Sequence, residues 1–127
     1  FNFGKMIRDF TYIEDVVEAI YLCSYKYATR ENDFNFFNTD ASTSFAPYRI
    51  FNVGNSEPIE ILNFIELLEK YTEKKALLNF VDKLPVDVVA TESNTSRLKN
   101  WINFSPKTNI EEGVKTFIKW YKNYYES

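Results

Sequence analysis

The sequence predicts an α/β fold built from short strands and three or more helices. Three observations support this prediction. Residues 4–19 change from the alternation typical of a strand to the spacing typical of a helix. Two later stretches, at about 60–73 and 109–125, place apolar residues on one helical face. Residues 48–53 are rich in β-branched and aromatic residues and are followed by a glycine, which is typical of a buried strand that ends in a turn.

The beginning of the chain is expected to form two short strands and the first helix. Residues 1–3 match the end of a strand, and residues 9–13 alternate as a second strand. Asp15 precedes two valines and is expected to cap the helix, which should run to about Tyr27. The buried face of this helix is expected to consist of the residues at positions 13, 16, 17, 20 and 23.

The middle of the chain combines a long polar stretch with a second helix. Residues 29–47 are rich in Asn, Ser and Thr and show no periodicity, which predicts an exposed loop. The helix at about 60–73 should follow Pro58 and bury a stripe of apolar residues. Residues 77–81 resemble a further strand, and residues 82–91 should connect it irregularly around a proline.

The end of the chain is expected to be helical. A short helix should span about 95–101 and end before Pro106. Thr108 and Glu111 match a capping box, in which each side chain accepts a hydrogen bond from the backbone N–H of the other residue. The last helix should then run over about 109–125. Its inward residues are expected to be Ile110, Val114, Phe117, Ile118 and Tyr121.

Composition excludes several classes of protein. The 127 residues suit one domain with a core, and twelve Phe with nine Tyr argue against a disordered chain. A net charge of −3 gives no basic surface for nucleic acid, and no apolar run is long enough for a membrane span. The single Cys23, together with the absence of a signal peptide, indicates the cytoplasm. Histidine is absent, so we expect no His-based metal site.

Four motifs resemble those of one enzyme family. They are residues 4–20 (GKMIRDFTYIEDVVEAI), residues 46–55 (APYRIFNVGN), residues 61–70, and residues 110–113 (IEEG) with the following Trp120-Tyr121. In this order and spacing they resemble nucleotide-sugar epimerases of the extended short-chain dehydrogenase/reductase family, with UDP-glucuronate 4-epimerases as the nearest group. The resemblance covers nearly the whole chain.

The resemblance implies that residues 1–127 are the C-terminal substrate-binding portion of a longer epimerase, with an exposed loop insertion at about 29–47. The chain begins without Met, and its three glycines form no dinucleotide-binding loop. In the family, the Rossmann sheet and the NAD site lie in a preceding domain. The implied partners are therefore a UDP-sugar and the chain's own N-terminal Rossmann domain, in a parent enzyme that forms a homodimer and binds neither nucleic acid nor membrane.

The implied reaction of the parent is the NAD-dependent interconversion of UDP-glucuronate and UDP-galacturonate at C4, for surface polysaccharide synthesis in the cytoplasm. Other UDP-hexose 4-epimerases, nucleotide-sugar dehydratases and decarboxylases remain alternatives, because these enzymes differ chiefly in residues of the N-terminal half. A non-catalytic binding or interaction module is an alternative of another class. Discarding a cofactor domain would expose apolar residues, among which we expect Phe1, Phe3 and Phe10.

Substrate binding is the role that the resemblance gives to four residues. Arg8 matches an arginine that contacts the diphosphate, Phe1 an aromatic residue beside the uracil, and Asp87 a carboxylate that faces the ribose hydroxyls. The alternatives are a surface arginine, a core aromatic residue and a turn residue. Leu84 occupies the position of a family glutamine or arginine but cannot donate a hydrogen bond, and Val86 replaces a family glycine.

No catalytic residue is expected in this chain. The family uses a Tyr-x-x-x-Lys pair, in which the tyrosine transfers a proton and the lysine holds the nicotinamide ribose. The chain has this spacing at Tyr71 and Lys75, but the pair lies at the charged end of a predicted helix, outside the family's catalytic region. We therefore interpret these two residues as a solvated helix end.

Overall fold

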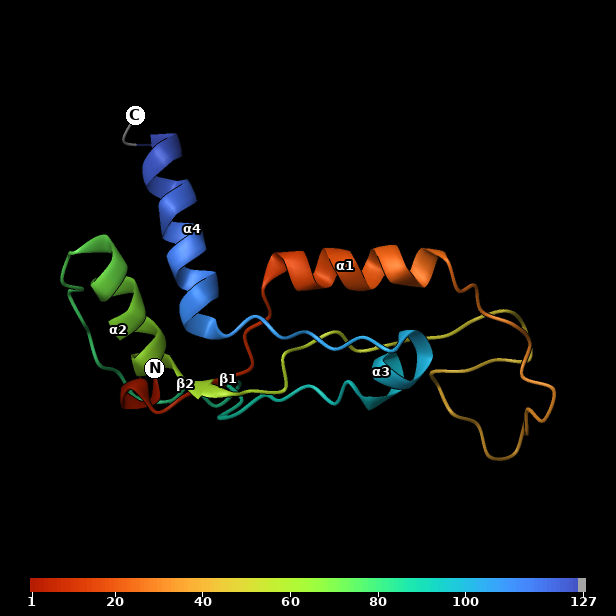
Figure 1. The fold of residues 1–127 in the computed structure, drawn as a ribbon. Helices are drawn as coiled ribbons and strands as arrows, with labels where there is room; N and C mark the ends of the chain where they lie inside the picture. The colour runs from red at the N-terminus through yellow and green to blue at the C-terminus, as the bar shows by residue number, and fades with distance from the viewer. Residues whose placement is uncertain (126–127) are drawn as a thin grey trace.

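A computed structural model describes residues 1–125, in which four α-helices are joined by long extended segments (Figure 1). The predicted α/β class with short strands and at least three helices is confirmed. In chain order the elements are the 3-10 turn η1 (Asn2–Gly4), β1 (Ile7–Arg8), α1 (Ile13–Ser24), β2 (Ile59–Glu60), α2 (Ile61–Thr72), α3 (Ser96–Ile102) and α4 (Ile110–Tyr125).

The strands form a small junction that joins three distant parts of the chain. β1 pairs antiparallel with β2, so that Ile7 lies opposite Glu60 and Arg8 opposite Ile59. On its other side Ile7 forms a parallel bridge to Ala90. The backbone N–H of Ile7 donates to Val89 O at 2.9 Å, and the N–H of Thr91 donates to Ile7 O at 3.2 Å. The strand that bears Arg8 is therefore held between the start of α2 and the segment around residue 90.

The core of the described residues is small because the helices pack in pairs rather than in one bundle. α2 packs against α4, and α1 contacts α3. Figure 1 shows α1 lying apart from α2 and α4. The buried apolar residues are Met6, Ala19, Leu98, Val114 and Ile118.

The helix α1 differs from the prediction at its start. It begins at Ile13, two residues before the expected cap, and Asp15 lies within its first turn. Asp15 is only 4% exposed, and its carboxylate accepts hydrogen bonds from the backbone N–H of Thr108 at 3.0 Å and of Lys107 at 3.4 Å. The predicted cap is therefore wrong. Asp15 instead fastens α1 to the turn that precedes α4.

The expected buried face of α1 is wrong at positions 13, 17 and 20, whereas Val16 and Cys23 are half-buried. Ile13, Val17 and Ile20 are 64%, 57% and 64% exposed, whereas Ala19, on another side of the helix, is buried. Periodicity correctly identified an apolar face. Within the described residues, however, no element covers that face, because α1 packs through the opposite side toward α3.

None of the four predicted strands forms, because the strands of residues 1–125 are Ile7–Arg8 and Ile59–Glu60. Residues 1–3 fold into η1, in which Asn2 and Phe3 adopt positive φ, a conformation that a strand excludes. Residues 9–13 instead lead into α1, and in residues 48–53 only Arg49 forms a bridge, to Thr43. Residues 77–81 run extended and make one backbone hydrogen bond, from Phe3 N to Val81 O at 3.2 Å. Strand-like composition is insufficient here because these segments have no neighbouring edge to pair with.

The three later helices lie close to their predicted bounds, but the predicted capping box is wrong. Asn109 accepts a 2.9 Å hydrogen bond from Glu112 N through its side chain, while the Thr108 N–H donates to Asp15. Glu111 instead reaches α2. Along α4, Val114 and Ile118 are buried as expected, whereas Phe117 and Tyr121 remain 50% and 41% exposed.

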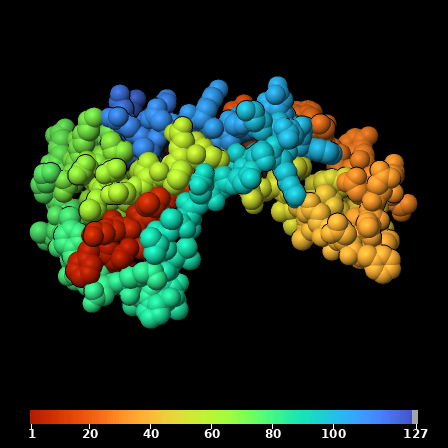
Figure 2. Space-filling model, turned by 90° about the horizontal axis from the view of Figure 1, so that it is seen from below, coloured from red at the N-terminus to blue at the C-terminus, as the bar shows by residue number. Residues whose placement is uncertain are grey.

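Residues 29–47 form an irregular loop that projects as a separate lobe (Figure 2). An ion pair of 2.8 Å joins Glu31 to Arg49, and another of 2.6 Å joins Asp40 to Arg97 on α3. Hydrogen bonds from Ser42, together with Arg97, hold the pKa of Asp40 below its ordinary value.

Within residues 1–125, no helix combines the length and apolar character needed to cross a bilayer.

Candidate functional site

One cavity of about 280 Å³ brings together three of the four candidate residues. It lies where η1, β1 and the start of α2 meet the extended segment before residue 88. Figure 2 shows the N-terminal residues in red directly beside this blue-green segment. Phe1, Arg8 and Asp87 line the cavity, but Leu84 does not. The other lining residues are Gly4, Met6, Ile61, Leu62, Ile65, Leu78, Asn79 and Phe80.

Arg8 reaches the cavity from β1 with part of its guanidinium unused. Its Nη1 donates to the backbone oxygen of Ile7 at 2.7 Å and of Val89 at 3.3 Å. Among the described residues, no carboxylate forms an ion pair with Arg8, and its Nε and Nη2 have no hydrogen-bond partner. A guanidinium anchored to the backbone at one nitrogen can present its remaining N–H groups to an anion.

Asp87 supplies the most unusual atom of the cavity. Its Oδ2 is buried, and it accepts no hydrogen bond from the described residues. Buried polar atoms are nearly always hydrogen-bonded, because leaving one unsatisfied costs about 1–3 kcal/mol. A ligand hydroxyl in the cavity would supply the missing donor.

The turn at residues 84–87 places Asp87 in spite of the departures noted in the sequence. The N–H of Asp87 donates to Leu84 O at 3.1 Å, which closes the turn. Val86, in place of a family glycine, is not among the residues with positive φ, and its side chain is 86% exposed. The turn therefore does not require glycine at this position, since a β-branched residue adopts negative φ without strain. Leu84 is 43% exposed at the start of the turn.

Gly4 allows the N-terminal turn to approach α2. Its φ is +79°, and an added Cβ would lie 2.7 Å from Leu62 Cγ. Only glycine accommodates both the backbone conformation and this contact. The close approach forms one wall of the cavity and holds Phe1 at its edge, where the ring is 59% exposed. Phe3 is 53% exposed, in agreement with the sequence-based expectation.

Asp9 organises the backbone behind Arg8, a role that the sequence analysis did not identify. Its carboxylate accepts hydrogen bonds from the N–H groups of Ser93 at 3.0 Å, Ser56 at 3.1 Å and Glu57 at 3.4 Å. These donors come from two segments that are distant in sequence. Gly54 lies at the same junction, where an added Cβ would be 2.3 Å from the Ser93 Cβ. Asp9 thereby fixes the strand that presents Arg8.

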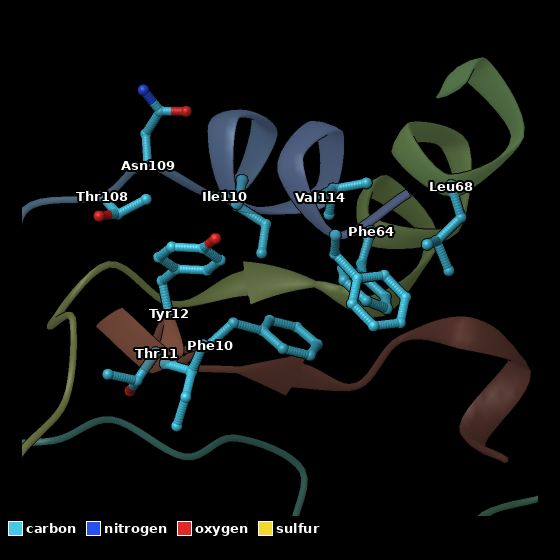
Figure 3. Close-up of a pocket in the computed structure, with 12 residues that line it drawn as sticks. Phe10, Thr11, Tyr12, Phe64, Leu68, Thr108, Asn109, Ile110 and Val114 are labelled. Carbon is cyan, nitrogen blue, oxygen red and sulfur yellow. The ribbon is translucent and has the colours of Figure 1, made fainter. Parts of the chain in front are cut away.

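A second cavity, of about 240 Å³, lies between α2, α4 and the segment before α1 (Figure 3). Phe10 stacks on Phe64 there, with ring centroids 4.4 Å apart, so Phe10 is half-buried and the prediction of an exposed Phe10 is wrong. The walls are mainly apolar, and no charged side chain lines them. This cavity therefore suits apolar contact and not a charged ligand.

Tyr71 and Lys75, which have the family's catalytic spacing, are engaged separately. The Tyr71 hydroxyl donates to Glu111 Oε1 at 2.7 Å, and Lys75 Nζ pairs with Glu69 Oε2 at 2.5 Å. The hydrogen bond to Glu111 raises the pKa of Tyr71 above its ordinary value. A tyrosine that transfers a proton at neutral pH needs the opposite shift. These residues join helix ends and form no acid–base pair.

Residues 1–125 do not fit a dinucleotide cofactor. An NAD site needs a glycine-rich turn between a parallel strand and the N-terminus of a helix. The only sheet in residues 1–125 is the antiparallel pair β1–β2. None of the three glycines in these residues lies in a turn between a parallel strand and a helix. Among the same residues, no group of three or more His, Cys, Asp or Glu is placed to hold a metal ion.

Comparisons with known proteins identify homologues, although no family model matches the chain. Protein CapI of Staphylococcus aureus is 39% identical over 126 residues, which is 99% of this chain and 38% of that protein. A probable UDP-glucuronate 4-epimerase of Rhizobium meliloti is 36% identical over 123 residues, covering 96% of this chain and 36% of that protein. The crystal structure of a UDP-glucuronic acid 4-epimerase from Bacillus cereus, in complex with UDP-glucuronic acid and NAD, has a TM-score of 0.70 at 25% identity, covering 98% and 35% of the two chains.

The chain spans less than two-fifths of the length of these curated relatives. Its homologues include UDP-glucuronate 4-epimerases, and its fold is that of the C-terminal part of NAD-bound enzymes of the extended short-chain dehydrogenase/reductase type. The resemblance seen in the sequence motifs is confirmed.

Proposed function

We propose that this chain, whose homologues are UDP-glucuronate 4-epimerases, is the UDP-sugar-binding portion, residues 1–127, of an NAD-dependent nucleotide-sugar 4-epimerase. The cavity lined by Arg8 and Asp87 is the observation that supports this proposal most directly. It combines a partly unpaired guanidinium with a buried carboxylate oxygen that has no partner. A nucleoside diphosphate offers the complementary groups, namely phosphate oxygens for Arg8 and ribose hydroxyls for Asp87.

Binding and orientation are the contributions that this chain's own residues would make. Arg8 would hold the diphosphate, Asp87 would accept from the ribose hydroxyls, and Phe1 would lie beside the base. Leu84 would contribute no polar contact and would act only through the turn that places Asp87. Fixing the nucleotide in this way presents the attached sugar to a reactive centre outside residues 1–127, which lowers the entropic cost of the reaction.

The NAD cofactor would supply the hydride transfer at C4 of the sugar when it is bound to a preceding Rossmann domain. The apolar face of α1 and the apolar cavity between α2 and α4 would contact that domain, because apolar surface of this kind is normally covered. The parent enzyme would be a cytoplasmic homodimer that interconverts UDP-glucuronate and UDP-galacturonate for surface polysaccharide synthesis.

Titration of UDP into the purified chain tests the binding part of this proposal. We expect saturable binding of UDP that is stronger than binding of UMP, since Arg8 contributes most through the diphosphate. The chain alone should bind no NAD and should not epimerise UDP-glucuronate. Turnover by the purified 127 residues would contradict the division of roles, and failure of the folded chain to bind UDP would contradict the assignment of the cavity.

The coding sequence upstream of Phe1 tests the wider proposal. We expect an open reading frame that encodes a glycine-rich loop and a Tyr-x-x-x-Lys pair, and we expect the longer protein to convert UDP-glucuronate. A start codon directly before Phe1 would favour a non-catalytic binding module instead.

A further inference from the structure

Phe80 is the second phenylalanine of the cavity that holds Arg8 and Asp87. It lines the cavity together with Phe1, Arg8 and Asp87, and its side chain is 49% exposed. Neither Phe80 nor Phe1 makes a ring contact within residues 1–125, although eleven such contacts join other aromatic pairs there. Two large aromatic faces are thus left uncovered at the wall of a site that also holds an unsatisfied carboxylate oxygen.

We propose that Phe80 and Phe1 together form the surface on which the nucleobase of the ligand stacks, with Phe80 as an additional binding residue. This inference rests on the UDP-sugar function proposed above. Phe80 would be a further residue that binds the base. Stacking on its ring would explain how the chain holds the uncharged end of the ligand.

The distribution of chemistry around the cavity supports this placement. The polar groups that suit phosphate and ribose come from Arg8 and Asp87, whereas the remaining wall is mostly aliphatic and aromatic. A planar heterocycle gains most from an aromatic face, and stacking of a base on an aromatic side chain is worth about 1–3 kcal/mol. The cavity volume of about 280 Å³ lies just below the range of about 300–1,000 Å³ that is typical of whole-ligand pockets. It therefore suits the nucleoside end of a UDP-sugar, with the sugar outside.

Packing within the chain does not explain the position of Phe80. The extended segment at 77–81 is fastened by the hydrogen bond from Phe3 N to Val81 O, and Leu78 is also 47% exposed. Leu77 is fully exposed on the same segment. A core residue would have been drawn inward, since burial of a phenylalanine side chain stabilises a fold by about 1.5–3 kcal/mol.

Binding of uridine, UMP and UDP to the 127-residue chain separates this inference from the proposed function. Saturation-transfer NMR and titration would be run on the wild type and on Phe80→Leu, Phe80→Tyr and Arg8→Ala, with Phe37→Leu as the matched control. Phe37 is fully exposed in the loop, so its substitution removes an aromatic ring without touching the cavity. Circular dichroism confirms folding of each variant.

We expect Phe80→Leu to weaken uridine, UMP and UDP by the same factor of about tenfold, because one stacked base is common to all three ligands. Phe80→Tyr should bind as the wild type does, and Arg8→Ala should weaken UDP while sparing uridine. Unchanged uridine affinity in folded Phe80→Leu, with UDP still dependent on Arg8, would overturn this inference and leave the proposed function standing. Failure of the folded wild type to bind either uridine or UDP would overturn both.

Discussion

Arg8 and Asp87 line the same cavity without forming an ion pair with each other. They are distant in sequence and meet because Ile7 in β1 bridges to the segment that follows Asp87. A cation and an anion that share a site and are not paired are both available to a ligand that presents phosphate and hydroxyl groups. Substitution of either residue separates that role from a purely structural one.

Arg8→Ala should weaken the binding of UDP by about thirtyfold, or about 2 kcal/mol, because a charged hydrogen bond to phosphate is lost. Arg8→Lys should restore only part of the affinity, since it keeps the charge and loses the planar pair of donors. In the full-length enzyme the loss should appear mainly in KM, because the diphosphate is the same in ground and transition states.

Calorimetry of UDP binding, together with the melting temperature of each variant, checks this prediction. Arg30, an exposed arginine in the loop, provides the matched control as Arg30→Ala. A lower melting temperature with unchanged UDP affinity would instead show that Arg8 serves only to fasten β1 to Val89 through its 3.3 Å hydrogen bond.

Asp87→Asn should reduce UDP affinity while leaving the chain at least as stable as the wild type. The buried oxygen has no partner in the described residues, so removing the charge relieves a cost of folding. An amide accepts hydrogen bonds from ribose hydroxyls less strongly than a carboxylate does. Urea unfolding and UDP titration measure the two effects, and Asp82→Asn on the same exposed connection is the control. A less stable Asp87→Asn protein with normal UDP affinity would assign Asp87 to the turn alone.

Asp15→Ala should destabilise the chain by about 1–3 kcal/mol. The substitution removes the acceptor of the backbone N–H groups of Lys107 and Thr108 and leaves them unsatisfied next to a buried helix turn. Glu14→Ala changes the exposed neighbour in the same turn and should cost much less. Chemical denaturation measures the free energy of unfolding of the two variants. Equal losses would mean that Asp15 contributes through its place in the first turn and not through these hydrogen bonds.

The helices could be predicted because their signals are local. α2, α3 and α4 each show apolar periodicity with a proline or polar boundary, and each lies within a residue or two of its expected bounds. Strands depend on a partner, which sequence alone does not supply. Residues 48–53 and 77–81 have strand-like composition, but the edges that they would pair with are absent from residues 1–125.

The candidate site was predictable only in part, for a similar reason. The resemblance pointed to Arg8, Phe1 and Asp87, but the cavity that joins them depends on the fold of distant segments. Asp9 and Asp15 illustrate the limit, since each accepts hydrogen bonds from backbone N–H groups far along the chain, whereas the sequence predicted only a local helix cap for Asp15. Periodicity likewise identified the apolar face of α1 without showing what covers it.

The carboxylate of Glu111 should give the contact between α2 and α4 a dependence on acid pH. Hydrogen bonds from Lys70 at 2.5 Å and from Tyr71 at 2.7 Å hold the pKa of Glu111 below its ordinary value. Because the pKa of this carboxyl is lower in the folded state, its contribution is present above the unfolded pKa of about 4.3 and is lost as pH falls through the folded pKa. The residue is half exposed, so the effect should be small.

Comparison of the wild type with Glu111→Gln by urea unfolding at pH 7 and at strongly acid pH tests this dependence. The difference in stability between the two proteins should be present at pH 7 and should disappear under acid conditions. Glu112→Gln, which changes the adjacent carboxylate on α4, should show a smaller difference at neutral pH. A gap between wild type and Glu111→Gln that persists unchanged in acid would rule out the ion pair as its source.

Val17→Glu should prevent self-association of the isolated chain while leaving its fold intact. Val17 lies in the middle of the exposed apolar face of α1, between Ile13 and Ile20, and exposed apolar faces of this kind tend to associate in concentrated solution. A charged side chain at that point costs little in the monomer, because no element of residues 1–125 covers it. Ala19→Glu is the contrasting variant, since Ala19 is 1% exposed and a buried unpaired charge should unfold the chain. Sedimentation velocity over a range of concentrations, with circular dichroism for folding, measures both effects. A wild-type chain that remains monomeric throughout, or a folded Val17→Glu protein that associates as strongly as the wild type, would show that the face of α1 is not an interaction surface.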